Sequence, residues 1–562
     1  MTKAIPEAKP RSRRLKWWGW GYEDQQLPRD QLEGIAKGVT ARLGFEVGEI
    51  EEPVPLDDVE LPSSRLAPPK ELAGIFSSER YDRVAHALGK AYRDVVRGFR
   101  GEFPNPPDLV AYPESPEDVD AILAWCGDEG AAAIPYGGGT GVVGGVEARM
   151  REDYPCVVTV DLRRMDRVLE VDPASQAARI QAGATGPALE EQLRDHGLTM
   201  RHFPQSFEYS TLGGWIATRS GGHFATLYTH IDDLVESVRA VTLDGDWESR
   251  RLPGSGAGPS PDRMLIGSEG ILGVIVEAWV RVRSRPTEKI SCGVAYEDFM
   301  AGAHAVREIS QSGLNPSNCR LLDAVEADTS SAGPPGKAIL VLGFESPEQP
   351  VEEPMSLALE ICRNHGGEPG EMKRSGAEPP GPAARSESPA PSEPGDDPVN
   401  AWRHAFLFAP YLRDALVACG VLSDTFETAI TWERFPGFHD EVMKTARRAV
   451  AEASGGPAEG RGSPRISCRF THVYPDGPAP YYTVLAPARR GDEVAQWDEI
   501  KAAVSEAVIG GGGTITHHHA VGRDHRPWYD RQRPDRFADA LRAAKRELDP
   551  KGLLNPGVLI DP

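Results

Sequence analysis

The feature that most constrains this chain is a glycine-rich segment in its first third. Residues 135–145 read PYGGGTGVVGG and follow an apolar, helix-like run at 121–126 and a strand-like run at 131–135. Glycine permits positive φ and lets the backbone come close to a ligand. Successive backbone N–H groups in such a turn form a concave site suited to a pyrophosphate. A flexible linker is the alternative, but linkers seldom lie between strand-like segments, so we predict a loop that binds nucleotide phosphates.

The same loop also matches a dinucleotide motif. Residues 139–144 fit G-x-G-x-x-G, and Asp161 lies downstream at the end of a second strand-like run, 157–160. A Rossmann unit needs its third glycine to open a crossover helix of about ten residues or more. Only residues 146–154 are available before Pro155, which is too short for that helix. We therefore interpret this motif as coincidental.

Two further segments combine glycines with hydroxyl side chains. Residues 204–220 read PQSFEYSTLGGWIATRS, and residues 267–275 read GSEGILGVI before a β-rich run at 276–282. The three segments, in this order and spacing, resemble the FAD-binding domain of the vanillyl-alcohol oxidase type, the PCMH-type fold. Glycine-rich turns of an ordinary α/β domain are the alternative interpretation. The resemblance implies that the first loop holds the pyrophosphate of FAD, while the other two wrap the ribityl, adenine and isoalloxazine groups.

The resemblance gives a set of expected cofactor-binding residues. They are Pro135, Tyr136, Gly137, Gly138, Gly139, Thr140, Gly141, Val142, Pro204, Gln205, Ser206, Phe207, Glu208, Tyr209, Ser210, Gly214, Thr218, Arg219, Ser220, Glu269, Gly270, Ile271, Leu272, Gly273, Val274 and Ile275. Residues 135–145 contain no histidine, although relatives with a histidyl-linked flavin often carry one there. We therefore expect FAD to be bound non-covalently.

Composition narrows the class of protein further. The chain has 562 residues, 40% of them hydrophobic, which is enough for two or more domains with large cores. Its formal net charge of −22 argues against nucleic acid as a main partner. No apolar run approaches the roughly 20 residues of a membrane span, and the basic N-terminus has no apolar core of a signal peptide. Seven widely spaced cysteines fit a reducing compartment, so we expect a cytoplasmic protein.

Changes in composition and in the pattern of apolar residues along the chain predict four parts and an α+β fold class. Residues 1–105 look mainly helical, for example at 29–43 and 80–98, and 106–286 form the PCMH-type FAD-binding domain, with Ser115 and Asp118 capping a helix. Residues 287–500 form a substrate or cap domain, and 501–562 a C-terminal segment that packs back on the FAD domain. Within the cap, residues 366–399 are rich in Pro, Gly, Ser and Glu, which predicts a disordered surface insertion.

Several other motifs resemble the alkyldihydroxyacetonephosphate synthase (alkylglycerone-phosphate synthase) family. They are KWWGWGY at 16–22, Trp215 and Arg219 in GGWIATRS, YLRD at 411–414, FET at 426–428, WER at 432–434, and HHHAVG at 517–522 followed by Trp528. The resemblance covers roughly residues 14–557, apart from the insertion. The sequence departs from the pattern of this family in three ways. It contains the insertion, and its stretch 220–229 is Gly-Gly-His-Phe-rich rather than lysine-rich. Its last residues, Ile560-Asp561-Pro562, do not form a recognisable peroxisomal signal.

The resemblance assigns candidate roles to single residues. Arg413 falls where the family has its substrate-binding arginine, in a position to clamp a phosphate; a structural ion pair with Asp414 or Glu427 is the alternative. Arg320 matches another arginine important for activity, with a core ion pair to Asp323 as its alternative. Tyr482 matches the catalytic tyrosine, although a shift of register would place Tyr481 there instead.

The histidine run His517, His518 and His519 completes the candidate catalytic set. Adjacent residues of a strand point to opposite faces, so three consecutive histidines on a strand cannot all meet one metal. No cluster of Cys, Asp and Glu at ligand spacing suggests a metal either, and we expect none. We expect His518 and one neighbour to be polar groups near the flavin and the substrate phosphate.

The family reaction sets the functional expectation. The resemblance implies that Tyr482 removes a C1 proton from acyl-dihydroxyacetone phosphate, that the flavin N5 holds the substrate without net redox, and that a fatty alcohol replaces the fatty acid. The alternative is an FAD-dependent oxidase or dehydrogenase of a 2-hydroxy acid or alcohol, because fold does not fix function.

The expected partner is a lipid substrate, and a homodimer is left open. The basic residues 9–16 before Trp17, Trp18 and Trp20 suggest a peripheral membrane contact, unless those tryptophans pack in the core.

Overall fold

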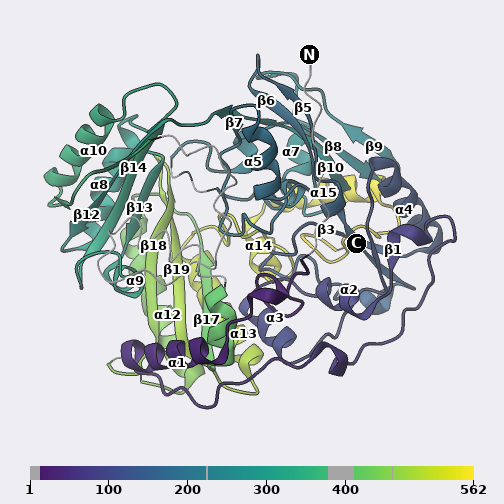
Figure 1. Cartoon of the computed structure of the whole chain (residues 1–562), viewed down its shortest axis with the longest axis horizontal. Helices are drawn as coiled ribbons and strands as arrows, with labels where there is room; N and C mark the ends of the chain where they lie inside the picture. The colour runs from purple at the N-terminus through teal and green to yellow at the C-terminus, as the bar shows by residue number, and fades with distance from the viewer. Residues whose placement is uncertain (1–12, 223, 225, 377–410, 458–459, 562) are drawn as a thin grey trace.

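The computed structural model describes residues 13–222, 224, 226–376, 411–457 and 460–561, which form two lobes (Figure 1). The first lobe holds two sheets. Its smaller sheet has the order β1-β2-β4-β3, in which β2, β4 and β3 are parallel, and its larger antiparallel sheet has the order β5-β6-β10-β8-β9. The strands are β1 Phe76–Ser77, β2 Leu109–Ala111, β3 Ala132–Tyr136, β4 Val157–Asp161, β5 Val168–Asp172, β6 Ala177–Gln181, β8 Val235–Thr242, β9 Gly245–Glu248 and β10 Val274–Arg281.

Helices pack around these two sheets. They are α2 Arg80–Ala85, α4 Pro116–Glu129, α5 Gly186–Arg194, α6 Leu212–Thr218, α7 Asp262–Leu265, α14 Arg526–Gln532 and α15 Asp535–Leu548, whereas α3 Tyr92–Phe99 packs against the second lobe. Ser115 and Asp118 form the predicted capping box at the start of α4. Between β3 and β4 the chain has only a 3-10 turn, Arg151–Asp153, so the segment lacks the crossover helix that a Rossmann unit needs.

The second lobe is one antiparallel sheet with the order β15-β12-β14-β13-β18-β19-β17, and β16 also pairs with β12. Its strands are β12 Glu288–Tyr296, β13 Asn318–Leu322, β14 Ala338–Ser346, β15 Glu368–Pro369, β16 Lys373–Ser375, β17 Val421–Glu427, β18 Arg465–Val473 and β19 Pro478–Pro487. β11 Arg283–Ser284, which directly precedes β12 in the chain, pairs with β7 Leu198–Thr199 of the first lobe to form a small two-stranded sheet. The predicted α+β class is confirmed by this architecture.

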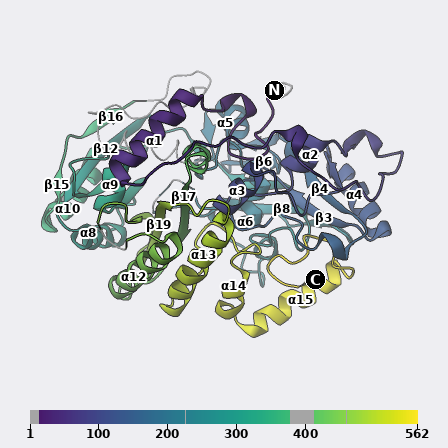
Figure 2. The same cartoon turned by 90° about the horizontal axis from the view of Figure 1, so that it is seen from below.

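Helices cover both faces of the cap sheet. On one side lie α8 Phe299–Gln311, α10 Glu352–Asn364, α12 Phe435–Ser454 and α13 Glu493–Gly510, while α1 Arg29–Leu43 and α9 Ala324–Ser330 lie on the other (Figure 2). Among the described residues, no helix is both long and apolar enough to cross a bilayer.

Two local expectations need correction. The helical pattern at 80–98 is not one helix but α2 and α3. The insertion predicted to be disordered from residue 366 begins with ordered chain, because β15 and β16 pair with β12 and satisfy their backbone groups. Residues 377–399 of that insertion lie outside the described residues.

The N-terminal aromatic segment is docked inside the protein. Trp17, Trp18 and Trp20 are 9%, 7% and 6% exposed, so they pack in the core and do not face a membrane. Asp414 holds this segment: its carboxylate accepts from Lys16 Nζ at 2.7 Å and from the Trp20 N–H at 3.0 Å. A Cβ on Gly19 would lie 2.4 Å from an Asp414 oxygen, so only glycine allows this approach.

We predict that Asp414→Ala destabilises the folded chain by about 3 kcal/mol, because removal of one partner leaves Lys16 buried and unpaired. Denaturant titration followed by tryptophan fluorescence measures the effect, and proteolysis after residue 14 should become faster. Glu114→Ala breaks the exposed pair with Arg164 and should change little. Equal stability of the two variants would contradict this view of the N-terminal segment.

Candidate active site

A cavity of about 1570 Å³ lies between the two lobes. Its walls come from the glycine-rich loops of the first lobe, from strands β13, β17, β18 and β19 of the cap sheet, from α1, and from the C-terminal histidine run. Segments that are hundreds of residues apart in the chain therefore meet around one space. An enclosed space at an interface between domains is the usual place for a cofactor and its substrate.

The first wall contains most of the residues expected to bind FAD. Those that line the cavity are Pro135, Tyr136, Gly137, Gly138, Gly139, Thr140, Gly141, Val142, Pro204, Gln205, Ser206, Ser210, Gly214, Thr218, Ser220, Glu269, Gly270, Gly273 and Ile275. The three glycine-rich segments, predicted separately, thus converge on one surface.

Seven of the expected residues do not line the cavity, and each has another role. Ile271, Leu272 and Val274 are buried in the core of the first lobe. Arg219 pairs with Asp232 at 2.8 Å. The remaining three are aromatic or acidic residues at 207–209: Phe207 stacks on Trp215, and Glu208 and Tyr209 both hydrogen-bond to the Tyr411 hydroxyl. The alternating directions of neighbouring side chains and the local turns of the backbone point these side chains away from the cavity.

The glycine-rich loop has the shape of a cradle for a ligand. A Cβ on Gly138 would lie 2.0 Å from the Tyr209 carbonyl, so the loop packs tightly against residues 209–211 on that side. A Cβ on Gly141 would meet no protein atom within 4 Å and would project into open space. The loop thus presents bare backbone to the cavity, as a phosphate-binding turn requires. These residues fit FAD.

Glu269 connects the glycine-rich segments that are expected to bind FAD with the C-terminal segment. Its buried carboxylate accepts from the N–H groups of Val521 at 2.9 Å and Gly522 at 2.9 Å. Burial raises the pKa of Glu269 to about 7, although these two N–H groups act in the opposite direction. Asn555 joins the same place by donating to the Glu269 carbonyl at 2.7 Å.

The cap sheet presents its polar face to the cavity. Glu427, Tyr481 and Arg469 are cross-strand neighbours on β17, β19 and β18, and they form one row across the sheet. The Arg469 guanidinium lies 4.0 Å from the centre of the Tyr481 ring, and the Tyr481 hydroxyl donates to Thr425 Oγ1 at 3.0 Å. Burial raises the pKa of Tyr481, while Arg469 opposes this by favouring the phenolate.

Tyr482 lies on the opposite face of the sheet, away from the cavity. Its ring stacks on Phe426 at 4.7 Å, its hydroxyl contacts His439 Nδ1 at 3.2 Å, and it is fully buried in the core. Because successive residues of a strand point to opposite faces, only one of the two tyrosines can reach the cavity. Tyr482, expected to be the catalytic tyrosine, does not line the cavity, whereas Tyr481, the residue considered in case of a register shift, does.

Arg413 and Arg320 both line the cavity. Arg413 lies in a helix that includes residues 411–418 and donates to the Lys90 carbonyl at 3.0 Å. Asp414 pairs with Lys16, so the ion pair considered for Arg413 with its neighbour does not form. Arg320 is 2% exposed, and burial, with Arg469 nearby, lowers its pKa to about 9. Asp323, its considered partner, accepts instead from the N–H groups of Glu326 and Cys468.

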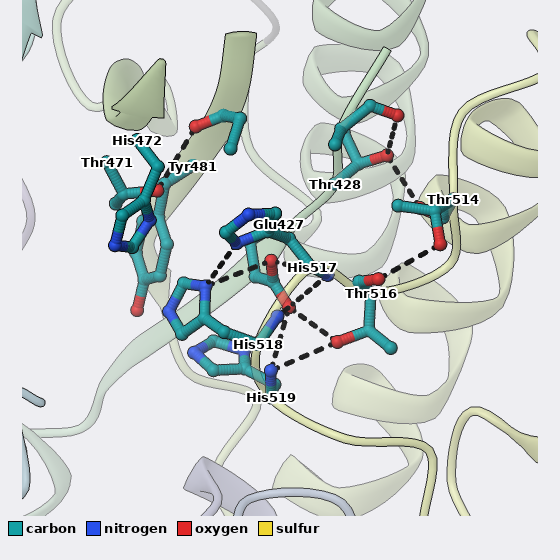
Figure 3. Close-up of polar contacts among 12 residues, drawn as sticks. Glu427, Thr428, Thr471, His472, Tyr481, Thr514, Thr516, His517, His518 and His519 are labelled. Atoms are coloured by element: carbon teal, nitrogen blue, oxygen red, sulfur yellow. Dashed lines mark hydrogen bonds and ion pairs between the residues drawn. The ribbon is translucent and has the colours of Figure 1, made fainter. Parts of the chain in front are cut away.

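The histidine run wraps around one carboxylate, that of Glu427 (Figure 3). Glu427 Oε1 accepts from the backbone N–H groups of His517 at 3.0 Å, His518 at 3.2 Å and His519 at 3.0 Å, and from the Thr516 hydroxyl at 2.6 Å. Burial alone would raise the pKa of Glu427, but the histidines hold it well below its ordinary value. Glu427 therefore remains an anion that fixes the loop, not the partner considered for Arg413.

The run is a loop and not a strand, so our reason for separating its three side chains does not hold. His518 and His519 line the cavity, while His517 turns outward. Ring nitrogens of His472, His517 and His518 lie within 4.8 Å of one another. These rings already have hydrogen-bond partners: His472 Nε2 contacts the Gly222 carbonyl at 2.7 Å, and His517 Nε2 contacts the Tyr474 hydroxyl at 2.7 Å.

Sequence reasoning missed four residues at this site: Glu427 as the holder of the loop, Arg469, His472 and His230. Of these, only Glu427 lay in a motif that the sequence analysis singled out, FET at 426–428, while His230 directly follows the stretch 220–229. Arg469 and His472 come into the site through pairing of β18 with β19, which no local pattern reveals.

The comparisons with known proteins agree with this geometry. Residues 107–249 match the family model "FAD binding domain", and residues 285–559 match "FAD linked oxidases, C-terminal domain". The two matches show an FAD-binding domain followed by the C-terminal domain of FAD-linked oxidases. The chain is similar to alkyldihydroxyacetonephosphate synthases over nearly its full length, as its motifs predicted.

Three relatives carry this placement. The chain is 28% identical to an alkyldihydroxyacetonephosphate synthase of Dictyostelium discoideum, over 97% of this chain and 93% of that protein. It is 29% identical to one of Trypanosoma brucei brucei, over 97% and 92%. A solved structure of an alkyldihydroxyacetonephosphate synthase shares the fold with a TM-score of 0.76, at 24% identity over 96% of this chain and 98% of that one.

We predict that Gly141→Ala leaves the protein folded but markedly lowers its FAD content, because the added methyl group meets only the space that the cofactor would fill. The ratio of flavin absorbance to protein absorbance measures the effect. Gly437→Ala, in the first turn of α12 with open space around it, is the matched control and should keep full FAD. A Gly141→Ala protein with a full complement of FAD would contradict the view that the glycine-rich loop holds the cofactor at Gly141.

Proposed function

We propose that this protein is an FAD-dependent alkylglycerone-phosphate synthase-like enzyme, which exchanges the acyl group of acyl-dihydroxyacetone phosphate for a fatty alcohol. The observation that supports it best is one cavity lined by the FAD loops and by Arg320, Arg413, Tyr481, His518 and His519. Bound FAD would supply an electrophilic isoalloxazine ring to this cavity. The other tasks fall to side chains of the two lobes.

The two arginines suit the phosphate of the substrate. Arg413 and Arg320 enter the cavity from different elements, a helix and β13, and guanidinium groups pair with phosphate oxygens through two parallel hydrogen bonds. Burial lowers the pKa of Arg320, and a dianion bound beside it would favour its charged form. We assign phosphate binding to Arg413, with Arg320 beside it.

Tyr481 suits the removal of the C1 proton. Its ring faces the cavity, it lies under the Arg469 cation, and His518 stacks against it with ring centres 6.1 Å apart. The cation lowers the cost of the phenolate that must accept a proton. We therefore assign the role of base to Tyr481 and that of a neighbouring polar group to His518, with His519 at the edge of the same wall.

The exchange reaction itself is tested by anaerobic incubation with acyl-dihydroxyacetone phosphate and a radiolabelled fatty alcohol. We expect labelled alkyl product while the flavin keeps its oxidised spectrum at the end of turnover. Bleaching by 2-hydroxy acids, followed by turnover with an electron acceptor and no alkyl product, would instead favour an oxidase.

The matched pair of tyrosines gives a sharp test of the base. Tyr481→Phe should lower the exchange of the C1 hydrogen with solvent deuterium by about 10²–10⁴-fold, as expected for loss of a general base. Tyr482→Phe removes a hydroxyl from the core and should leave that exchange within a few fold of the wild type. Mass spectrometry of the recovered substrate measures both. Equal rates in the two variants would remove Tyr481 from the mechanism.

We also propose that FAD is held without a covalent bond, since residues 135–145 offer no histidine. Acid precipitation of the purified protein should leave yellow FAD in the supernatant, and absorbance of that supernatant checks it. Colour that stays in the washed pellet would show a covalent link.

A further inference from the structure

Three histidine rings form a continuous hydrogen-bonded line that starts at the cavity. His518 lines the cavity, and its Nδ1 lies 3.0 Å from Nδ1 of His517. Nε2 of His517 lies 3.1 Å from Nε2 of His230, and Nδ1 of His230 lies 3.1 Å from the Arg219 carbonyl oxygen. His230 is partly exposed, so the line runs from the enclosed cavity toward the surface of the first lobe.

The partners fix where each hydrogen lies. A carbonyl oxygen only accepts, so Nδ1 of His230 carries a hydrogen, and a neutral His230 accepts at Nε2. His517 Nε2 has two partners, His230 Nε2 at 3.1 Å and the Tyr474 hydroxyl at 2.7 Å. With the Tyr474 hydroxyl donating to Thr229 Oγ1, His517 donates from Nε2 to both and accepts at Nδ1, which requires His518 to donate from Nδ1. The free acceptor of the line is therefore Nε2 of His518, at the cavity end. All three rings are oriented in one direction, as proton transfer along the line requires.

The surroundings keep the middle of the line neutral. Burial lowers the pKa of His517 well below its ordinary value, and His230 and His518 act in the same direction. Burial also lowers the pKa of His230. A neutral imidazole both donates and accepts, so it passes a proton on without holding it. At the cavity end, Glu427 Oε2 lies 3.4 Å from His518 Nδ1.

The proposed reaction needs such a path, and this step rests on the proposed function. The bond from C1 to the carboxylate oxygen breaks, and a bond from C1 to the alcohol oxygen forms. The C1 proton leaves and returns, so it does not count in the balance. The alcohol arrives with its O–H hydrogen, whereas the fatty acid leaves as a carboxylate near pH 7. Each turnover therefore releases one proton inside the cavity.

We propose that His518, His517 and His230 form a proton relay, which carries the hydrogen of the alcohol from the cavity to His230. When His230 has taken a proton on Nε2, its Nδ1–H bond to the Arg219 carbonyl opens and the Nδ1 hydrogen passes to a water molecule at the surface. His518 touches the reacting groups, whereas His517 and His230 act through it. Tyr474 shares the relay by placing its hydroxyl 2.7 Å from His517 Nε2 and 3.0 Å from Thr229 Oγ1. It thereby fixes the His517 ring between its two neighbours.

The test uses the FAD-loaded full chain with His230→Asn. We expect kcat for alkyl product to fall by about tenfold or more, with KM and FAD content unchanged and with a larger effect of D₂O on kcat. Imidazole added to the buffer should restore part of the rate, because the missing ring is the partly exposed one. His517→Gln should give a similar loss, and the double variant should lose no more than either single variant.

His196→Asn is the matched control, since His196 is an exposed histidine of the same lobe and far along the chain from the cavity segments. It should keep the wild-type rate and show no response to imidazole. A wild-type kcat and D₂O effect in His230→Asn would overturn the relay, and so would a loss that imidazole does not restore in a variant that retains FAD.

A measurement without turnover separates the relay from the proposed function. In ¹⁵N-histidine NMR spectra of the wild type, we expect His230 to carry its hydrogen on Nδ1 and His517 on Nε2, with assignments from the two variants. The opposite tautomer of either ring would overturn the relay even if alkyl product forms. A wild type with the expected tautomers but without alkyl product would overturn the proposed function and leave the relay standing as a proton path.

Discussion

The active site depends on one buried anion, the carboxylate of Glu427. It lies at the end of β17 in the cap sheet and holds the backbone of residues 516–519, which belong to the C-terminal segment. An isolated carboxylate would be costly to bury, but four donors and the adjacent histidine rings satisfy it. The same contact sets the position of His518 in the cavity and the position of His517 behind it. It therefore connects the cap sheet to the histidine side of the cavity and to the proposed proton relay.

A second tie between lobes acts from the opposite end of the chain. Asp414 holds the N-terminal segment through Lys16 and Trp20, and its neighbour Arg413 reaches the cavity from the same helix. The phosphate-binding side of the site is therefore fixed by an N-terminal contact, whereas its histidine side is fixed by a C-terminal one. Glu269, which bonds to Val521 and Gly522, links the C-terminal segment to the cofactor loops as well.

The sequence predicted the parts of this protein that depend on local chemistry. Gly137, Gly138 and Gly139 leave no room for a Cβ against Thr211, Tyr209 and Tyr136, whereas Gly141 borders open space. Ser115 with Asp118 marks a helix start by hydrogen bonds within four residues. The choice between Tyr481 and Tyr482 could not be made, since it depends on which face of β19 meets the cavity. His230 and His517 are 287 residues apart, so their contact exists only once both lobes have folded.

Helix α1 forms the outer wall of the cavity, and it is unusual in its lining. Gly34 and Gly38 both line the cavity, and a Cβ on either would meet no atom within 4 Å. Glycine inside a helix costs about 1 kcal/mol relative to alanine. The two glycines therefore make α1 less stable while they leave more volume in the cavity. Larger side chains at these two positions would fill part of that space without touching Arg413, Tyr481 or the histidines. The volume of this part of the cavity is thereby separated from the chemistry, and substitutions on one helix would change it without altering the groups proposed to react.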